Sequence, residues 1–513
     1  MHKSCQSTEG MQKIWDNIVI GSGMGGLSAA SLLAKSGQSV LILEKGTSPG
    51  GCCSSFLKSG FLFETGATTL IGWEDGLPLE RMEKCLGLQF PKMELALSMK
   101  VHLDGEVISR YSDIGDWIRE CCRVFGNPKR QKMFWKLTFF LSKKVWELSS
   151  RYKFFPWTSV SDFFQTVKVF KFSDLTTLFF SFLKTRQVLI LLGLGNDQKF
   201  IKFLSEQLMI TNQCSVEDAP FLFASAGLTY PNLKNYYVPG GMIEIPNTLL
   251  NFIRSKGGEC KNKSEVVSIE RQHLDKTKHC WSIKTKKDTY HSKNLISDLP
   301  IWNLAQLYLG TEKSLDQAAL SFEKGIWGAF TLGIAIRADI KDEKCLHHQI
   351  HVNHHLPHGG GQSIFVSLSH EEDSIRTKNG IRILSISTHI QEPEKWERKS
   401  NEYLIQKEEL TNSILSVLKN TFEWFDKDQI VSFHAATPAT WFTWTGRKNG
   451  RVGGIPTSFF RNPFRYLSPI SKISNLYLTG DTIYPGQGIP AVCLGGMNLA
   501  NRMLLDKERL ILP

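Results

Sequence analysis

The sequence predicts an α/β protein in which a nucleotide-binding domain is interleaved with a helical region and an antiparallel sheet. Three patterns predict this class: a strand–helix–strand unit begins near residue 14, residues 76–230 are mostly helical, and strands with alternating apolar and polar residues follow. The 513 residues suffice for two or three compact units, and 42% hydrophobic with 21% charged residues excludes a disordered or fibrous chain.

The first unit consists of a strand at residues 14–20, a helix at residues 25–36 and a second strand at residues 39–44. Five of the seven residues of the first strand are apolar, which is typical of a buried strand of a parallel sheet. The loop between this strand and the helix reads GSGMGG.

This loop has the spacing of a dinucleotide-binding fingerprint. Gly21, Gly23 and Gly26 form G-x-G-x-x-G between the strand and the helix, and Glu44 ends the second strand. The glycines allow a tight turn and close approach of a pyrophosphate, the helix N-terminus favours the anion, and the acid can bind ribose hydroxyls. The sequence therefore predicts a Rossmann-like domain with a bound adenine dinucleotide.

Two later segments favour FAD over NAD as this dinucleotide. Gly51 belongs to a Gly-Gly pair shortly after Glu44, and residues 475–480 predict a strand that ends in Gly480 and Asp481. An aspartate there can bind a polyol hydroxyl, and a helix beginning near Pro490 can direct its positive end to the anionic edge of a reduced flavin.

Between these segments lies a basic stretch that is rich in Phe. Residues 129–202 contain 14 Lys and Arg against four acids, which leaves +10 of the total net charge of +12. Phe occurs there in pairs such as Phe163-Phe164 and Phe179-Phe180. One interpretation is a helical core with solvated lysines, and the other is a surface that contacts a membrane.

The second half of the chain predicts an antiparallel sheet and further helices. Alternating strands are expected at residues 329–337, 347–355, 363–369 and 381–390, a helix at about 402–422, and a terminal helix after the Gly/Pro-rich loop. The resulting domain prediction is residues 11–75, 235–300 and 430–513 for FAD binding, 76–234 for a helical cap, and 301–429 for an antiparallel substrate-binding sheet.

Histidine and cysteine patterns do not predict a metal site. Seven of the 14 His lie between residues 347 and 370, but HHQIHVNHH is strand-like and has no fixed acidic partners, so a solvated or pocket-lining strand is expected, with proton transfer as the lesser alternative. The eleven Cys have no CxxC spacing, which favours reduced thiols. Vicinal Cys52 and Cys53 lack the spacing of a flavin-linked disulfide.

Four segments resemble the phytoene desaturase and carotenoid isomerase family of FAD enzymes, which also includes retinol saturase. They are GSGMGGLSAASLLAKSGQSVLILEK, PGGCCSSFLKSGFLFETGAT, YYVPGGMIEI and YLTGDTIYPGQGIPAV. Other segments, such as AATPATWFTWTGRKNGRVGGIP, resemble the branch of carotenoid C-3',4' desaturases. Two positions depart from the family: Cys52 stands where many relatives have an Arg that contacts the pyrophosphate, and Glu64 stands for an Asp.

The resemblance implies roles for individual residues in binding FAD. It places Gly21, Ser22, Gly23 and Gly26 on the pyrophosphate, Glu44 with neighbouring Lys45 at the adenosine ribose, Gly51 near the flavin, the Val266 backbone on the adenine, Gly480 and Asp481 at the ribityl chain, and Gly488, Ile489, Pro490, Ala491 and Val492 along the isoalloxazine. No residue is implied as a catalytic base.

The function implied by the resemblance is the FAD-dependent introduction of a 3',4' double bond into a carotenoid. Isomerisation of a prolycopene-type carotenoid and saturation of a retinol remain alternatives with the same motifs. An amine oxidase shares the fold, although the Phe-rich stretch fits a lipid substrate better. Escort proteins of prenylated small GTPases share the fold without flavin.

A carotenoid is insoluble in water, so we expect the enzyme to lie peripherally on the cytoplasmic side of a membrane, in a bacterial cytoplasm or a plastid-like compartment. Interfacial binding of this kind needs no spanning helix. Nucleic acid and metal are not expected as partners.

Overall fold

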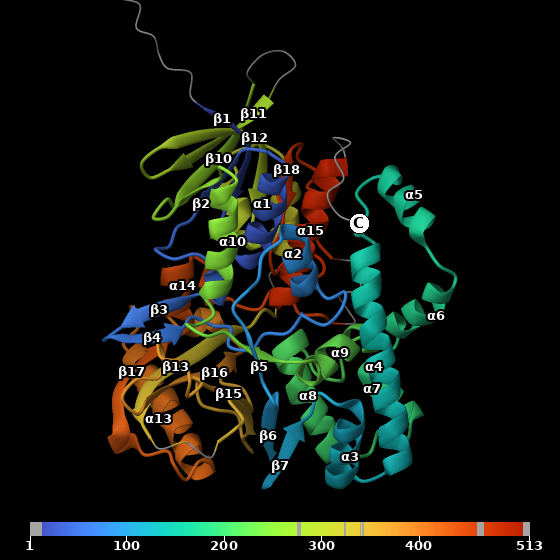
Figure 1. Ribbon diagram of the computed structural model, residues 1–513, viewed down its shortest axis with the longest axis vertical. Helices are drawn as coiled ribbons and strands as arrows, with labels where there is room; N and C mark the ends of the chain where they lie inside the picture. The colour runs from blue at the N-terminus through green and yellow to red at the C-terminus, as the bar shows by residue number, and fades with distance from the viewer. Residues whose placement is uncertain are drawn as a thin grey trace, which may run out of the picture.

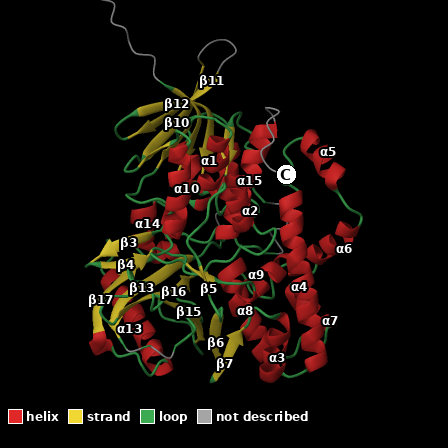
Figure 2. Cartoon of the chain, viewed as in Figure 1, coloured by secondary structure: helices red, strands yellow, loops and turns green. Residues whose placement is uncertain are grey.

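The computed structural model describes residues 13–273, 279–322, 325–338, 340, 343–458 and 466–505. It contains two large sheets at opposite ends of the molecule and a helical region along one side (Figure 1). The coloured view of secondary structure separates these three parts clearly (Figure 2). The α/β class predicted from the sequence is confirmed.

The first sheet is built from segments that lie far apart in the sequence. Its strand order is β10-β11-β12-β1-β2-β9, and β18 pairs with the C-terminal half of β12. The pairs β12–β1, β1–β2, β2–β9 and β12–β18 are parallel, whereas β10–β11 and β11–β12 are antiparallel. The strands are β1 (Ile14–Ile20), β2 (Val40–Leu43), β9 (Glu259–Lys261), β10 (Val266–His273), β11 (His279–Thr285), β12 (Thr289–Ser297) and β18 (Leu476–Leu478).

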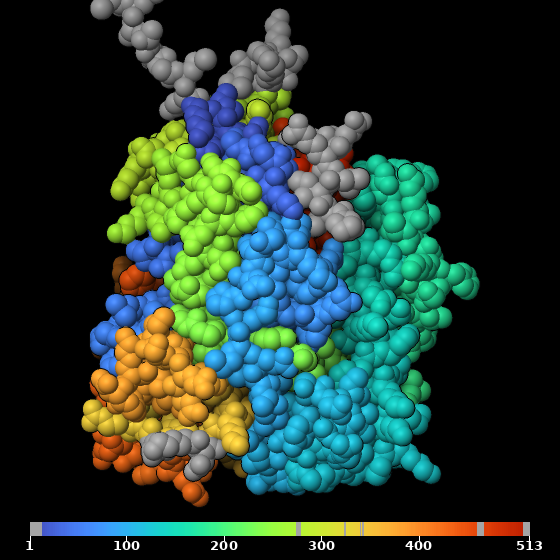
Figure 3. Space-filling model, viewed as in Figure 1, coloured from blue at the N-terminus to red at the C-terminus, as the bar shows by residue number. Residues whose placement is uncertain are grey.

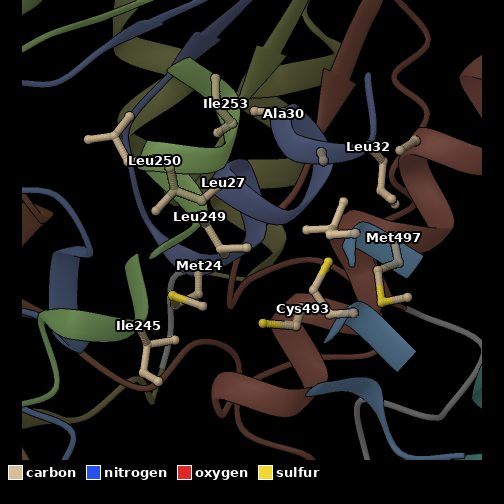
Figure 4. Close-up of a cluster of buried hydrophobic side chains, with 14 of the residues drawn as sticks. Met24, Leu27, Ala30, Leu32, Ile245, Leu249, Leu250, Ile253, Cys493 and Met497 are labelled. Atoms are coloured by element: carbon tan, nitrogen blue, oxygen red, sulfur yellow. The ribbon is translucent and has the colours of Figure 1, made fainter. Parts of the chain in front are cut away.

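Helices cover both faces of this sheet. One face packs against α1 (Met24–Lys35), α10 (Glu244–Ser255) and α15 (Ile489–Leu505), with α2 (Pro78–Leu86) beside them. Figure 4 shows the side chains between these helices, among them Leu27 from α1, Leu249 from α10 and Met497 from α15. The other face packs against α11 (Ile301–Leu307) and α12 (Ser314–Phe322).

The second sheet has the order β17-β13-β16-β15-β14-β6-β7 and is antiparallel except for the pair β14–β6. α13 (Tyr403–Thr421) covers one face through Leu410, Ile414 and Leu418, and the hairpin of β3 and β4 lies against the other. The strands are β3 (Ser55–Lys58), β4 (Phe61–Glu64), β6 (Met99–Leu103), β7 (Glu106–Arg110), β13 (Gly328–Arg337), β14 (His347–His351), β15 (Ser363–Leu368), β16 (Ile381–Ile390) and β17 (Ile430–Ala436).

The helical region lies beside the second sheet and forms one flank of the molecule (Figure 3). Its core contains Trp117, Phe134, Trp135, Phe200 and Phe203, all fully buried. The helices are α3 (Ile114–Phe125), α4 (Pro128–Arg151), α5 (Val160–Val169), α6 (Ser173–Phe179), α7 (Thr185–Leu191), α8 (Gln198–Asn212) and α9 (Phe221–Thr229). Among the described residues, no helix combines the length and apolar character that crossing a bilayer requires.

The segment expected to be a helical cap at residues 76–234 also contains strands. β6 and β7 extend the second sheet, and β5 (Met93–Glu94) pairs with β8 (Tyr236–Tyr237). The turn between β6 and β7 is Asp104-Gly105, and both residues have positive φ, at 50° and 81°. An Asp-Gly turn between alternating residues is typical of a β-hairpin, so the sequence contains the signal for these strands.

Candidate dinucleotide-binding site

The glycine-rich loop joins the end of β1 to the first turn of α1. Gly21 has a φ of 92°, which favours glycine, and Gly23 caps α1 without a side-chain hydrogen bond. The first turn of α1 contains no acidic side chain. No acidic side chain of α1 itself therefore neutralises the positive end of the helix dipole at the loop. This arrangement favours an anion such as a pyrophosphate.

Glu44 follows β2 and lies against this loop. Its Oε2 accepts hydrogen bonds from the Ser22 N–H at 2.9 Å and the Ser22 hydroxyl at 2.5 Å, and its Oε1 accepts one from the Gly46 N–H at 2.6 Å. These bonds hold a carboxylate beside the loop, where the fingerprint predicts the ribose. Lys45 is directed elsewhere, with its Nζ 3.1 Å from the Glu265 carboxylate.

The Gly50-Gly51 pair is joined to the same loop. The Gly50 N–H donates to the Ser22 carbonyl at 2.9 Å. A Cβ on Gly51 would lie 3.7 Å from the Gly23 Cα, and a Cβ on Gly50 would lie 2.4 Å from the Cys53 carbonyl oxygen. The two glycine segments are thus in contact, as their predicted roles require.

The turn after β18 reaches the loop from the other side. A Cβ on Gly25 would lie 2.8 Å from the Gly480 N, so the backbone of this turn is in close contact with the first turn of α1. Gly480 has a φ of 100°. Residues 21–26, 44, 51 and 480–481 therefore converge, although more than 430 positions of the sequence separate the ends of this set.

Arg447 is a site residue that the sequence analysis did not single out. Its Nη2 donates to the Asp481 Oδ2 at 2.7 Å, and the two side chains are only 12% and 18% exposed. Burial opposes the charge on the guanidinium, but Asp481, Cys52 and Asp298 together raise the pKa of Arg447. The only sequence signal is an arginine after Gly446 within one of the segments that resemble the desaturase branch.

Asp298 is a second residue that the sequence analysis missed. It follows β12, its carboxyl accepts a hydrogen bond from the Gly26 N–H, and a Cβ on Gly23 would lie 2.3 Å from its Oδ2. Burial raises the pKa of the Asp298 carboxyl well above its usual value, and the charges of Asp481 and Glu44 raise it further. The sequence feature that could have identified Asp298 is its position at the carboxyl end of a parallel strand, where ligands bind in folds of this class.

The remaining predicted residues lie around this centre. Val266 begins β10 and is buried, and nearby Ser264 donates its N–H to the Glu44 carbonyl. Residues 488–492 contain the start of α15, which crosses α1 further along: a Cβ on Gly496 would lie 2.3 Å from the Gly25 carbonyl oxygen. The isoalloxazine contacts predicted for residues 488–492 stay a prediction.

The residues present fit a polar dinucleotide. In the described part of the chain, the buried hydroxyls of Thr479 and Thr482 have no hydrogen-bond partner, and they flank the Gly480-Asp481 turn. Unpartnered buried hydroxyls are costly unless a ligand or water satisfies them. Together with the N-terminal end of α1 and the Arg447 guanidinium, they supply donors and acceptors suited to phosphate and polyol groups.

Glu64, which replaces the aspartate of many relatives, belongs to a buried ionic network. It lies 2.8 Å from the Arg376 Nη1 and accepts hydrogen bonds from the Ser55 hydroxyl and the Met242 N–H. Arg376 also donates to the Tyr237 hydroxyl. The network ties the β3–β4 hairpin to the loop before α10, which explains why an acid is needed at this position.

Two histidines of β14 are fully buried and neutral. The His347 Nδ1 lies 2.8 Å from the Ser367 hydroxyl, and the His348 Nδ1 lies 3.1 Å from the His102 Nε2. Burial lowers the pKa of His347 to about 3 and that of His348 to about 4. Within the described residues, no three His, Cys, Asp or Glu side chains are grouped to hold a metal ion.

Comparisons with known proteins agree with this geometry. Residues 19–86 match the family of NAD(P)-binding Rossmann-like domains. The chain is 27% identical to the chloroplastic prolycopene isomerase of Arabidopsis thaliana over 97% of this chain and 84% of that protein. It is 52% identical to human all-trans-retinol 13,14-reductase over 61 residues, which is 12% of this chain and 10% of that protein. Putrescine oxidase superposes with a TM-score of 0.62 at 13% identity, covering 97% of this chain and 100% of that one.

The chain thus shares its fold with putrescine oxidase and is similar in sequence to prolycopene isomerase over nearly its whole length. Among its relatives by sequence are prolycopene isomerases, all-trans-retinol 13,14-reductases and a 4,4'-diapolycopene oxygenase, so the chain resembles the family of carotenoid desaturases, carotenoid isomerases and retinol saturases. The fold class and the resemblance predicted from the sequence are confirmed.

Proposed function

We propose that the protein is an FAD-dependent carotenoid desaturase that introduces a 3',4' double bond into a long apolar polyene. The observation that carries the cofactor assignment is the convergence of the glycine-rich loop, Glu44 and the Gly480-Asp481 turn around Gly25. When bound there, FAD would supply an acceptor for the hydride that leaves the polyene.

The contributions of the protein are binding and orientation. The end of α1 and Arg447 provide positive potential for the pyrophosphate, and Glu44 and Asp481 provide carboxylates for ribose and ribityl hydroxyls. Desaturation removes a hydride from one allylic carbon and a proton from its neighbour, so the geometry of the polyene relative to the cofactor governs the rate. The second sheet, joined to the cofactor domain through the β3–β4 hairpin, is the proposed platform for the polyene.

The substrate class rests on the relatives and on the branch resemblance. The names of the relatives include prolycopene and all-trans-retinol, which are both conjugated polyenes. The 3',4' position follows from the segments that resemble the C-3',4' desaturases.

A second candidate function is the cis–trans isomerisation of a carotenoid. It is favoured by the similarity to prolycopene isomerase, which extends over nearly the whole chain. Product mass distinguishes the candidates, because a desaturase removes two hydrogens, an isomerase removes none, and a saturase of the retinol type adds two.

We further propose that the protein reaches its substrate by binding a membrane surface through α5 and α6. On these two helices polar side chains are buried and Phe side chains are exposed, which is the opposite of the usual pattern of a helix at a protein surface. They bury Asp162, Thr166, Asp174 and Thr177. Their outward positions, with the turn that follows, expose Phe163, Phe164, Phe170, Phe172, Phe179 and Phe182, which we call the Phe surface.

Buried ion pairs hold the Phe surface in this orientation. Arg502 of α15 donates to the Asp162 Oδ1 at 2.8 Å, and Arg151 of α4 donates to the Asp174 Oδ2 at 2.7 Å. Phe172 is 84% exposed, and Lys168 and Lys171 lie exposed on the same segment. Apolar side chains ringed by lysines favour an anionic lipid interface. α5 and α6 lie at the outer edge of the molecule, away from both sheets (Figure 1).

The test of the enzymatic proposal is expression in a host that produces lycopene, with the pigments analysed by absorption spectrum and mass. Wild type is expected to give a pigment with two fewer hydrogens and absorption at longer wavelength. Asp481→Ala, which removes a charge-assisted hydrogen bond of about 1.5–3 kcal/mol to FAD, is the inactive comparison. Unchanged pigment mass with an altered isomer pattern would favour the isomerase instead.

A further inference from the structure

A cavity lies between the second sheet and the loop that follows β4. This loop lines one side of the cavity, and residues of β13, β15, β16 and β17 line the other. Within the loop, the Ala67 N–H donates to the Cys52 carbonyl at 3.0 Å, directly after the Gly51 that is predicted to lie near the flavin. The cavity therefore lies between the proposed platform for the polyene and the proposed position of the flavin.

Among the described residues that line this cavity, Glu64 and His434 have ionisable side chains. Glu64 is fully engaged, with its Oε1 2.8 Å from the Arg376 Nη1 and its Oε2 accepting a hydrogen bond from the Ser55 hydroxyl at 2.5 Å. The His434 Nδ1 is buried and has no hydrogen-bond partner in the described part of the chain, and the same is true of the Ser385 hydroxyl in this lining. His434 is thus an ionisable group of the cavity with a free acceptor position.

Packing fixes the imidazole of His434 in this position. The ring makes edge-on contacts with Phe56 and Phe63, at centroid distances of 4.9 Å and 4.6 Å and interplanar angles of 76° and 75°. Gly333 lies opposite His434 on β13, and a Cβ on Gly333 would collide with the Cε1 of the ring. The missing side chain at position 333 therefore provides the space for the ring, and the two Phe side chains hold it against the cavity.

The imidazole is neutral and lies between the cavity and the edge of the second sheet. Burial lowers the pKa of His434 to about 4, and the charges of Lys58 and Lys407 lower it further. With its hydrogen on Nε2, a neutral imidazole presents Nδ1 as an acceptor. β17 is the edge strand of the second sheet and His434 is partly exposed, so a proton taken up at Nδ1 can leave to the solvent (Figure 1).

We propose that His434 accepts at its Nδ1 the proton that the polyene loses during desaturation. This inference rests on the proposed function. The C–H bond next to the carbon that loses the hydride breaks, its electron pair becomes the new C=C bond, and the proton forms the Nδ1–H bond. The hydride, with its two electrons, is taken up by the oxidised flavin. Because the departing hydride leaves positive charge on the polyene, the neighbouring C–H bond becomes strongly acidic and a neutral imidazole is a sufficient base.

The test measures how fast a lycopene-type carotenoid reduces the bound flavin without oxygen in wild type, His434→Ala and His389→Ala. His389 is the matched control, since it is also a histidine of the second sheet whose pKa burial lowers to about 4, but it packs edge-on against Trp327 and does not line the cavity. We expect His434→Ala to lower the rate about hundredfold or more with unchanged FAD content. His389→Ala is expected to keep a rate close to that of wild type.

Chemical rescue separates proton transfer from packing. His434→Ala leaves a space of the size of the ring beside Phe56 and Phe63, which imidazole and pyrrole fill about equally well, but only imidazole has a basic nitrogen. We expect added imidazole to restore part of the rate in proportion to its concentration, and pyrrole to leave the rate unchanged. A rate that imidazole raises no more than pyrrole does would overturn the inference.

A wild-type rate in His434→Ala would also overturn the inference, and it would leave the proposed function intact if the product still has two fewer hydrogens. Wild-type protein that forms no such product would overturn the proposed function, and the inference with it. If His434→Ala does not fold, His434→Gln takes its place, because it keeps a side chain beside Phe63 but has no basic nitrogen. A wild-type rate in His434→Gln would contradict proton transfer to His434.

Discussion

Gly23 is constrained both as the N-cap of α1 and by close contact with the Asp298 side chain. It caps α1, and a side chain there would collide with the Asp298 carboxyl, because a Cβ on Gly23 would lie 2.3 Å from the Asp298 Oδ2. The collision displaces either Asp298 or the loop. We expect Gly23→Ala to lower the flavin content of the purified protein, measured by absorbance after denaturation. Full flavin occupancy in this variant would contradict the assignment of the loop.

Asp298 predicts a pH dependence of FAD binding. Its pKa is raised by burial and by Asp481 and Glu44, and its neutral form repels the pyrophosphate less than its charged form does. The affinity for FAD should therefore be highest below this raised pKa and decline as the pH rises through it.

The measurement is the dissociation constant of FAD between about pH 5 and pH 9, compared with Asp298→Asn. The variant cannot acquire the charge, so its affinity should lack this decline. The same pH profile in wild type and Asp298→Asn would assign the titration to another group.

At the scale of elements, the crossing of α1 and α15 packs the N-terminal and C-terminal parts of the chain together beside the first sheet. A Cβ on Gly496 would lie 2.3 Å from the Gly25 carbonyl oxygen and 2.9 Å from the Ser28 Cβ, so the helices have no room for a side chain there. We expect Gly496→Ala to lower the free energy of unfolding by about 1–3 kcal/mol in urea denaturation.

The matched control for this substitution is Gly115→Ala, in the first turn of α3, where the nearest atom to a Cβ is the Asp113 Oδ1 at 3.1 Å. Helix propensity predicts no loss or a gain of up to about 1 kcal/mol at this position. Equal free energies of unfolding of Gly496→Ala and wild type would show that α1 and α15 can move apart enough to accommodate a methyl group, which contradicts the expectation.

Several elements of both sheets could be predicted because their signals are local. β1 and β16 occupy the residues expected for them, and the predicted helix at residues 25–36 is α1 (Met24–Lys35). The β6–β7 hairpin was missed because helical segments surround it, although its Asp-Gly turn is a local signal. Its pairing with β14 is a tertiary contact over more than 240 residues, which no local pattern reports.

The candidate site divides in the same way. Gly21, Glu44 and Asp481 were predictable from a fingerprint and from a resemblance. The charges of Arg447 and Asp298 interact only in the folded chain, because more than 140 residues separate the two positions in the sequence. Their side chains carry no motif of their own, so sequence spacing could not identify them.

For the whole molecule, the Phe surface predicts salt-sensitive binding to anionic lipid. Wild type should sediment with vesicles that contain an anionic lipid at low salt, and less at high salt because the contribution of the lysines is screened. Replacing both Phe164 and Phe172 by Ser should weaken the partition about tenfold or more, since apolar burial in the interface is lost.

Phe433→Ser is the control for this experiment, because Phe433 is 55% exposed but lies on β17 in the second sheet, away from the Phe surface. Folded wild-type protein that remains in the supernatant at both salt concentrations would refute membrane attachment.

In the proposed reaction, electrons pass from a polyene to a flavin held where the glycine-rich loop, Glu44 and the Gly480-Asp481 turn converge. The most direct measurement mixes the purified, flavin-loaded protein with a lycopene-type carotenoid in vesicles without oxygen, and records flavin absorbance and product mass together. We expect the absorbance of oxidised flavin to fall in proportion to the formation of a product with two fewer hydrogens and absorption at longer wavelength. A product of unchanged mass, or conversion with no change in the flavin spectrum, would contradict it.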